Sequence, residues 1–310
     1  MASRSALRVL IAGASGLIGT ELTRQLRADG HEVLKLVRRR PTADDEVNWA
    51  PSARTMDFRV LGEVDAVVNL AGASVGRIPW TPRYRATLRD SRVQPTQTLA
   101  EGMNQVATPP AVFLSGSAVG FYGDRPGERL TEDSPAGHGF FSELVTAWEA
   151  AAALAPKKTR VVTMRTAVVV ARGGGLAPVR LLTGLGLGAR FATGGQYWPW
   201  ISLYDEAAAI RHLLASKLSG PVNLAGPIPA TSDRITHAYA RRMRRPYRLR
   251  VPERAVKLLG EAGERLLLDS AKVYPARLEA DGFEWRHRRV EQAIDAVFTP
   301  ASDAAPRAPA

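Results

Sequence analysis

The stretch Leu7-Arg8-Val9-Leu10-Ile11-Ala12-Gly13-Ala14-Ser15-Gly16-Leu17-Ile18-Gly19 decides the fold of this chain. Its first half is a short, mostly apolar run, which is typical of a buried parallel strand. From Leu17 to Asp29 apolar side chains recur at helical spacing, and Gly30 stands where a helix would end. Strand, glycine turn and helix in this order aim a helix N-terminus at a phosphate group. The pattern predicts a dinucleotide-binding turn; the alternative is a merely tight strand–helix connection.

Backbone groups at the turn and at the strand ends are the predicted contacts of the cofactor. Glycine is needed in the turn because a side chain would hold the backbone away from a pyrophosphate. Ligands of open α/β sheets also bind at the carboxyl ends of the strands, where Asn69-Leu70-Ala71-Gly72 and Ser115 are expected. The predicted cofactor-binding residues are therefore Gly13, Ser15, Gly16, Leu17, Ile18, Gly19, Leu70, Ala71, Gly72 and Ser115.

The end of the second predicted strand, residues 31–37, selects the cofactor. Chains built for NAD usually place an acidic residue about twenty residues after the glycines, where it holds the ribose hydroxyls. Here the strand runs into Arg38-Arg39-Arg40, and Glu32 lies too early to take that role. Arginine suits a 2′-phosphate, so the sequence predicts NADP, with Arg38 and Arg39 as its clamp. The alternative is a solvated strand end, which is the favoured interpretation for Arg40.

Further strands and helices alternate along the chain. Strands are predicted over 64–70, 111–115 and 160–170, and helices over 82–103 (interrupted near Pro95) and 140–154. This alternation predicts an α/β fold with a doubly wound parallel (Rossmann) sheet and a smaller C-terminal lobe on the substrate side. We expect residues 7–172 to form the NADP-binding domain and 173–298 the lobe, interleaved with it, between disordered ends at 1–6 and 299–310.

Composition excludes several classes of protein. Among 310 residues there is no cysteine, which excludes disulfides and thiol chemistry, and the five histidines lack ligand-like spacing, so no metal site is expected. No apolar run has the length of a membrane span and no signal-peptide core is present, so we expect a cytoplasmic protein without a membrane partner. Its oligomeric state is not indicated.

The formal net charge of +12 is concentrated late in the chain, most densely at Arg241-Arg242-Met243-Arg244-Arg245. Such a patch can attract nucleic acid. However, no nucleic-acid motif and no aromatic residues spaced for base stacking accompany it. A solvated face, or attraction to an anionic substrate, is the favoured interpretation.

Many short motifs, in order, resemble one known family. Besides Asn69-Leu70-Ala71-Gly72 they include Ser117-Ala118-Val119-Gly120-Phe121-Tyr122-Gly123-Asp124, Trp148-Glu149, Trp200-Ile201, Asp205, Pro275-Ala276-Arg277-Leu278 and Gly282-Phe283. From residue 9 to about 293 the chain is similar to the extended short-chain dehydrogenase/reductase superfamily. Within it, the chain resembles the NAD(P)-dependent epimerase-like family that carries its own C-terminal domain.

The superfamily's usual catalytic relay is absent from this sequence. The resemblance implies a tyrosine and, four residues later on the same helix, a lysine that lowers its pKa, with a serine or threonine orienting the substrate oxygen. Ser117 fits the orienting role, but the alignment puts Phe141 and Val145 at the other two positions. No lysine occurs between Lys35 and Lys157. Tyr122 and His138 are the predicted candidates to replace the relay; a packed ring and a loop residue are the alternatives.

Substrate contacts are predicted at Gln196, Trp200 and Arg92. The aromatic and amide groups of residues 196–200 suit a sugar or another flat ligand, although Trp200 is equally suited to a core. Arg92 suits an anion or a structural ion pair. Together these features predict an NADP-dependent oxidoreductase or epimerase-like enzyme for a small, anionic or nucleotide-linked substrate. The alternative is a catalytically silent NADP-binding sensor or interaction protein.

Overall fold

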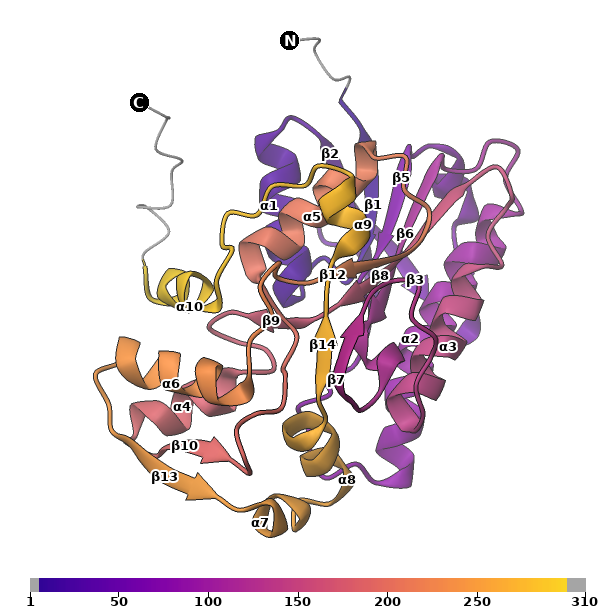
Figure 1. Cartoon of the computed structure of the whole chain (residues 1–310). Coiled ribbons are helices and arrows are strands. Elements are labelled where there is room, and N and C mark those ends of the chain that lie inside the picture. The colour runs from indigo at the N-terminus through magenta and orange to yellow at the C-terminus, as the bar shows by residue number, and fades with distance from the viewer. Residues whose placement is uncertain (1–5, 300–310) are drawn as a thin grey trace, which may run out of the picture.

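The structure is a computed structural model that describes residues 6–299. The ends predicted to be disordered, 1–6 and 299–310, fall outside the described residues except for residues 6 and 299. Within 6–299 the core is an eight-stranded sheet, parallel throughout except for its last strand (Figure 1). In spatial order its strands are β12 (Gly220–Leu224), β8 (Arg160–Thr166), β6 (Val112–Ala118), β5 (Ala66–Asn69), β1 (Arg8–Ala12), β2 (Glu32–Val37), β3 (Glu46–Ala50) and β4 (Thr55–Met56).

Helices cover both faces of this sheet because its central strands are apolar on both sides. Val9 and Ile11 of β1 pack into one core with α1 (Leu17–Ala28) and α5 (Leu203–Ala215). Leu10 and Ala12 point to the other face and pack against α2 (Pro82–Met103), which lies beside α3 (Phe140–Ala152). The prediction of a doubly wound parallel sheet is confirmed.

Three elements differ from the sequence prediction. The helix expected to break near Pro95 is continuous through it, with Pro95 buried; a proline removes only one backbone donor, and packing holds the rest of α2. The strand expected over 160–170 divides into β8 and β9 (Val168–Val170), and β9 leaves the main sheet to pair with β11 (Trp200–Ser202). β6 extends to Ala118, so Ser117 lies within a strand and not after one.

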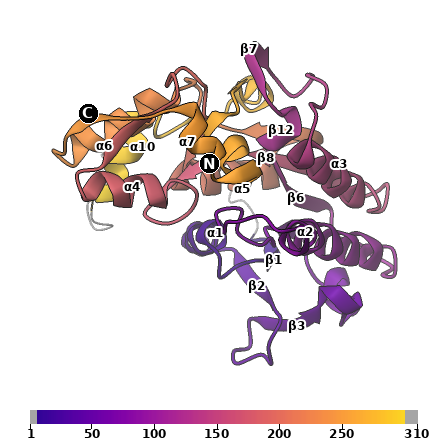
Figure 2. The same ribbon diagram turned by 90° about the horizontal axis from the view of Figure 1, so that it is seen from below.

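The smaller C-terminal lobe lies to one side of the sheet, opposite α2 and α3 (Figure 2). It contains α4 (Ala177–Gly184), β10 (Gly188–Phe191), α6 (Ser232–Arg242), β13 (Tyr247–Val251), α7 (Glu253–Lys257) and α10 (Val290–Phe298). β10 and β13 pair in parallel, with α6 packed against β10. Between the lobe's elements, β12 returns to the edge of the main sheet.

The last part of the chain packs back against the main sheet. β14 (Ala271–Val273) pairs with β7 (Arg125–Leu130), and α9 (Ala276–Ala280) follows along β12. Phe283 and Trp285 then join the same core as β1, and Trp285 donates its indole N–H to the carbonyl of Ala225. Short helices α8 (Gly260–Gly263) and η4 (Glu264–Leu268) precede this segment. None of the helices in 6–299 has the length and apolar character to cross a membrane.

Candidate functional site

The glycine turn after β1 has three glycines with different structural roles. Gly13 has a φ of +81°, and a side chain there would meet the Leu70 carbonyl carbon at 2.8 Å. Gly19 has no room for a side chain either, because its Cβ would lie 2.2 Å from the Gly13 oxygen. At Gly16 a Cβ would have only one neighbour within 4 Å, the Gly13 oxygen at 3.2 Å. The fold itself therefore requires Gly13 and Gly19, whereas Gly16 leaves space free above the turn.

The N-terminus of α1 opens into that space. Gly16 is its N-cap, no side chain caps the first amides, and the first turn contains no acidic residue. Ser15 and Leu17 are exposed beside it, and Ile18 is half-buried. Free amides and the positive end of the helix dipole are suited to an anion. The donor set at this turn therefore fits the pyrophosphate of a dinucleotide.

The two predicted clamp arginines differ in their surroundings. Arg39 makes a bidentate ion pair with Glu46, at 2.6 and 2.8 Å, and also donates to Thr42. Arg38 is exposed at the end of β2, and across residues 6–299 its side chain has no hydrogen bond or ion pair. Arg38 is thus the arginine available to a 2′-phosphate, while Arg39 is held by a carboxylate.

Hydrogen bonds from buried groups fix the backbone at the end of β5. The fully buried Asn69 accepts a hydrogen bond from the Ala71 amide and donates to Thr96, and the Leu70 amide donates to the Ala12 carbonyl. Arg92 lies against Gly72, donating to the carbonyls of Leu88 and Ala73, with its guanidinium over the Trp148 ring.

Arg92 carries a positive charge without a carboxylate partner anywhere in the described chain. Burial lowers its pKa to about 10, which still leaves the guanidinium charged at neutral pH. An unneutralised, mostly buried cation behind the end of β5 attracts an anion to the carboxyl edge of the sheet.

Three polar residues lie in one row across the neighbouring strands. Ser117 of β6 pairs in register with Arg165 of β8, which in turn pairs with Asn223 of β12. Residues in register on adjacent strands point to the same face, so these side chains meet although they are far apart in the sequence.

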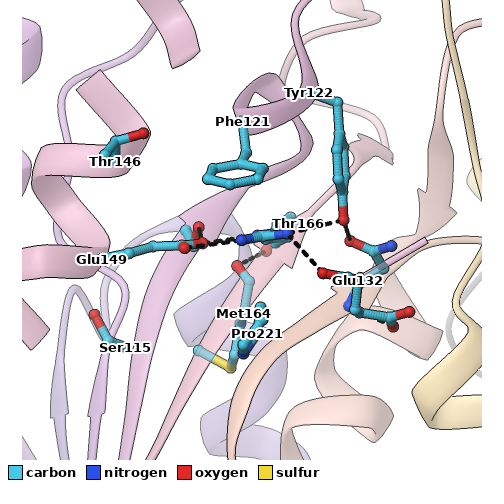
Figure 3. Close-up of polar contacts among 12 residues, drawn as sticks. Ser115, Phe121, Tyr122, Glu132, Thr146, Glu149, Met164, Thr166 and Pro221 are labelled. Carbon is cyan, nitrogen blue, oxygen red and sulfur yellow. Dashed lines mark hydrogen bonds and ion pairs between the residues drawn. The ribbon is translucent and has the colours of Figure 1, made fainter. Parts of the chain in front are cut away.

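A carboxylate from α3 completes the row. The Ser117 hydroxyl donates to Glu149 Oε1 at 2.6 Å, and Arg165 binds the same carboxylate through Nε at 2.8 Å and Nη2 at 3.0 Å. The Arg165 guanidinium also lies 3.5 Å from the centre of the Phe121 ring. In Figure 3 the dashed lines run from Glu149 on one side to Tyr122 and Glu132 on the other. Because the Ser117 proton is directed at Glu149, its oxygen is left as an acceptor.

Tyr122 is fully buried at the far end of this network. Its hydroxyl donates to Asn223 Oδ1 at 2.7 Å and accepts from Arg165 Nη1 at 3.1 Å. Burial raises the pKa of the phenol. Burial likewise raises the pKa of the neighbouring Glu132, whose Oε1 accepts from the backbone amides of Asn223 and Arg277. Both hydrogen-bonding positions of Tyr122 are used within the fold.

The two positions of the missing relay are apolar in the structure as well. Phe141 forms an edge-to-face pair with Trp80, at 5.0 Å between ring centres. Val145 is 1% exposed in a cluster with Leu88, Leu144 and Trp148. A lysine at position 145 would lie in this apolar cluster, so no ammonium group reaches the site from α3.

The other predicted site residues lie outside the network. The His138 side chain is exposed. Gln196 is buried and donates to the carbonyls of Phe191 and Leu267, and Trp200 is a core residue whose indole donates to Ile228. Ser115 is fully buried, with its hydroxyl on the Gly116 carbonyl.

The sequence suggested no role for Glu149 or Asn223, and for Arg165 it suggested contact with an anion or a structural ion pair. The signal for two of them was a polar residue inside an apolar strand, as in residues 160–170 and 221–224. Glu149 lies in Trp148-Glu149, one of the motifs shared with the family, but that motif indicated no chemical role, since a glutamate on a helix is usually solvated. Within residues 6–299 no group of three His, Asp or Glu side chains is arranged to hold a metal ion.

Comparisons with known proteins agree with this fold. The sequence model of the NAD-dependent epimerase/dehydratase family matches residues 9–226, and that of a domain of unknown function matches 251–297. An epimerase family protein of Mycobacterium bovis is 41% identical over 295 residues, which cover 94% of this chain and 97% of that protein.

Two solved structures are also similar. The crystal structure of the human epimerase family protein SDR39U1 with NADPH has a TM-score of 0.85 and 31% identity, covering 94% of this chain and 99% of that one. A nucleoside-diphosphate sugar epimerase of Corynebacterium glutamicum has a TM-score of 0.77 and 33% identity, covering 94% of this chain and 57% of that one.

Proposed function

Because this chain belongs to the NAD-dependent epimerase/dehydratase family, we propose that it is an NADP-dependent oxidoreductase or epimerase. Its substrate is small and anionic or nucleotide-linked. The observation that carries the proposal is the Ser117–Glu149–Arg165 array at the carboxyl edge of the sheet, beside a turn that fits a pyrophosphate. The relatives support the cofactor: SDR39U1 was solved with NADPH.

Residues of this chain would hold the cofactor in two places. The amides of Leu17 to Gly19 would receive the pyrophosphate, and Arg38 the 2′-phosphate. Leu70, Ala71 and Gly72 would line the floor at the end of β5. When bound, the nicotinamide supplies hydride transfer to or from a substrate carbon.

Ser117 and Glu149 take the place of the missing relay in this proposal. The Ser117 oxygen accepts a hydrogen bond from the substrate hydroxyl, because its own proton already points to Glu149. When that hydroxyl is oxidised, its proton passes to Ser117 as the Ser117 proton passes to Glu149, and the reverse occurs in reduction. Arg165 positions the carboxylate and is not itself a catalytic residue. Tyr122 has a structural role here, because it is fully buried and already satisfied.

An anionic substrate is supported by charge. Arg92 adds an unneutralised cation at the end of β5, next to the space where a substrate would meet the nicotinamide. Its charge would draw a carboxylate or phosphate toward that edge of the sheet.

A catalytically silent NADP-binding protein is the second candidate function. Phe141 and Val145 favour a silent protein, because these apolar residues stand where the usual relay has its tyrosine and lysine, and they cannot transfer a proton. The two functions share the cofactor site and differ only in turnover.

Fluorescence titration with NADPH and NADH, followed by a panel of nucleotide sugars and carbonyl compounds, tests both. We expect NADPH to bind more tightly than NADH. Gly16→Val should abolish binding of both cofactors with the fold retained, because the added side chain fills the space above the turn. Turnover that Ser117→Ala strongly reduces, at unchanged NADPH affinity, supports the enzyme. Tight binding without turnover across the panel favours the silent protein, and no binding contradicts both.

A further inference from the structure

One end of the C-terminal lobe exposes leucines that a folded domain normally buries. Leu181, Leu182, Leu185 and Leu187 are 60%, 44%, 68% and 49% exposed, and they lie within seven consecutive residues. We call residues 181–187 the leucine turn. Single exposed leucines are ordinary, but four exposed within seven residues mark an apolar region of the kind that usually contacts something.

The leucine turn is held in a fixed conformation. After α4 the Gly186 amide donates to the Thr183 carbonyl, and the Leu187 amide to the Leu182 carbonyl. With a φ of +83° at Gly186, these bonds form a Schellman motif, the tight ending typical of helices followed by glycine. Leu185 and Leu187 therefore project from an ordered turn.

An arginine-rich turn lies directly beside it. We call residues 244–248 the arginine turn. A side chain at Gly188 would meet the Pro246 carbonyl oxygen at 2.8 Å, and one at Gly184 would meet Met243 at 3.1 Å. Arg244, Arg245 and Arg248 are exposed, and within 6–299 their side chains have no ion pair or hydrogen bond. Apolar and cationic surfaces are thus adjacent.

The arginine turn also has a fixed backbone conformation where it begins. α6 also ends in a Schellman motif, with amides of Arg244 and Arg245 bonded to the carbonyls of Arg241 and Ala240. Its left-handed position, at a φ of +53°, is occupied by Arg244, where glycine is the favoured residue. Arg244 therefore has a backbone conformation that residues other than glycine rarely adopt.

We propose that the leucine turn and the arginine turn together dock on the surface of an anionic phospholipid membrane. The leucines would enter the boundary between head groups and acyl chains, and the arginines would bind the lipid phosphates. A second copy of the chain fits less well, because a symmetric interface would bring the same unpaired arginines together. Nucleic acid offers phosphates but no apolar phase for the leucines. The prediction of no membrane partner rested on the lack of a spanning segment, and surface docking needs none.

Co-sedimentation of the full chain with vesicles tests the proposal. The vesicles contain phosphatidylcholine alone or mixed with phosphatidylglycerol, at low and high salt. We expect binding only to the anionic vesicles, weakened by salt. Leu185→Asn/Leu187→Asn and Arg244→Glu/Arg245→Glu should each reduce the partition coefficient by about tenfold or more. Arg89→Glu/Lys157→Glu removes two exposed cations outside both turns and should leave binding within about twofold, as a matched charge control.

Several outcomes overturn the proposal. The proposal is wrong if the protein does not sediment with anionic vesicles. It is also wrong if the Arg89/Lys157 control reduces binding as much as the arginine-turn variant does, since binding would then be general charge attraction. Concentration-dependent dimers in light scattering that the leucine variant abolishes would assign the surface to a second copy. Unchanged NADPH affinity in the leucine variant supports the proposal, whereas its loss would place the leucine turn in the cofactor site. Circular dichroism of each variant confirms that it has folded.

Discussion

At the scale of single residues, the neighbouring Arg38 and Arg39 after β2 have the same side-chain chemistry but different partners. Both suit a 2′-phosphate by sequence, but Arg39 is already bound to Glu46. The Arg39 guanidinium lowers the pKa of the Glu46 carboxyl to about 2. An arginine neutralised by a carboxylate contributes less to a phosphate than a free one. The sequence could not make this distinction, because Glu46 belongs to the next strand and reaches Arg39 only in the folded sheet.

Arg38→Glu should therefore weaken NADPH binding by about tenfold or more and leave NADH binding nearly unchanged, because only NADPH carries the 2′-phosphate. Arg40→Glu, at an exposed neighbouring position, is the control and should alter NADPH affinity much less. Fluorescence titration with both nucleotides measures each variant. Equal losses of NADPH and NADH affinity in Arg38→Glu would contradict the clamp assignment.

The buried pair of Glu149 and Arg165 gives a second prediction. Glu149→Leu leaves the buried Arg165 guanidinium without its counter-ion and should lower the free energy of unfolding by about 3–5 kcal/mol. Glu149→Leu/Arg165→Met removes both charges and should recover a large part of that loss. Urea unfolding measures both, with Arg165→Met completing the cycle. Single and double variants that are equally destabilised would show that the two charges are not coupled.

At the scale of elements, local patterns identified most strands and helices, including α1, α3 and the end points of α2. These depend on periodicity and capping, which neighbouring residues determine. The division between β8 and β9 was missed because an apolar run does not show which strand it pairs with. The row of Ser117, Arg165 and Asn223 was missed for the same reason: it depends on the register of three strands far apart in the chain.

The first turn of α5 makes folding stability depend on pH. Burial raises the pKa of Glu206 to about 8; its Oε1 accepts from Thr166 and its Oε2 has no partner. Between the ordinary glutamate pKa and about 8 the folded chain keeps a proton that the unfolded chain has released. Stability from this group therefore falls as pH rises through that window, and the loss is complete above it.

Glu206→Gln removes this titration. We expect the variant to match the wild type near pH 5 and to exceed its free energy of unfolding by about 2–4 kcal/mol above pH 8. Urea unfolding across this pH range measures the effect, and Glu143→Gln, at an exposed glutamate of α3, should keep the wild-type slope. Parallel curves for Glu206→Gln and the wild type would mean that Glu206 is ionised in the folded protein.

At the scale of the whole molecule, the C-terminal segment and the main sheet share one core. Phe283 and Trp285 belong to the same apolar cluster as Val9 and Ile11, and the amides of Arg286 and His287 donate to the buried carboxylate of Asp205. The sequence predicted a boundary near residue 173, where glycine becomes frequent, and a later lobe interleaved with the first domain. Composition marks a change of local structure there, but it does not show which core the later residues complete.

Trp285→Ala should therefore lower the free energy of unfolding of the entire molecule by about 3–5 kcal/mol, because it empties a site in the shared core. Calorimetry should show a single transition at a lower Tm, with the loss of NADPH binding at the same temperature. Trp198→Ala, in the separate core of the lobe, is the comparison. Two resolved transitions in Trp285→Ala would mean that the C-terminal segment unfolds independently.

The return of the C-terminal segment to β12 also sets the order of events during synthesis. The ribosome makes β1 long before the segment from β14 to Trp285, yet both line one apolar cluster. Until that segment has left the exit tunnel, β12 lacks its covering and the carboxylate of Glu132 lacks the Arg277 amide. Since chains emerge at about 5–20 residues per second, a nascent chain that already contains the whole glycine turn waits on the order of tens of seconds with an open core. During that interval its exposed apolar surface is open to aggregation and to capture by chaperones.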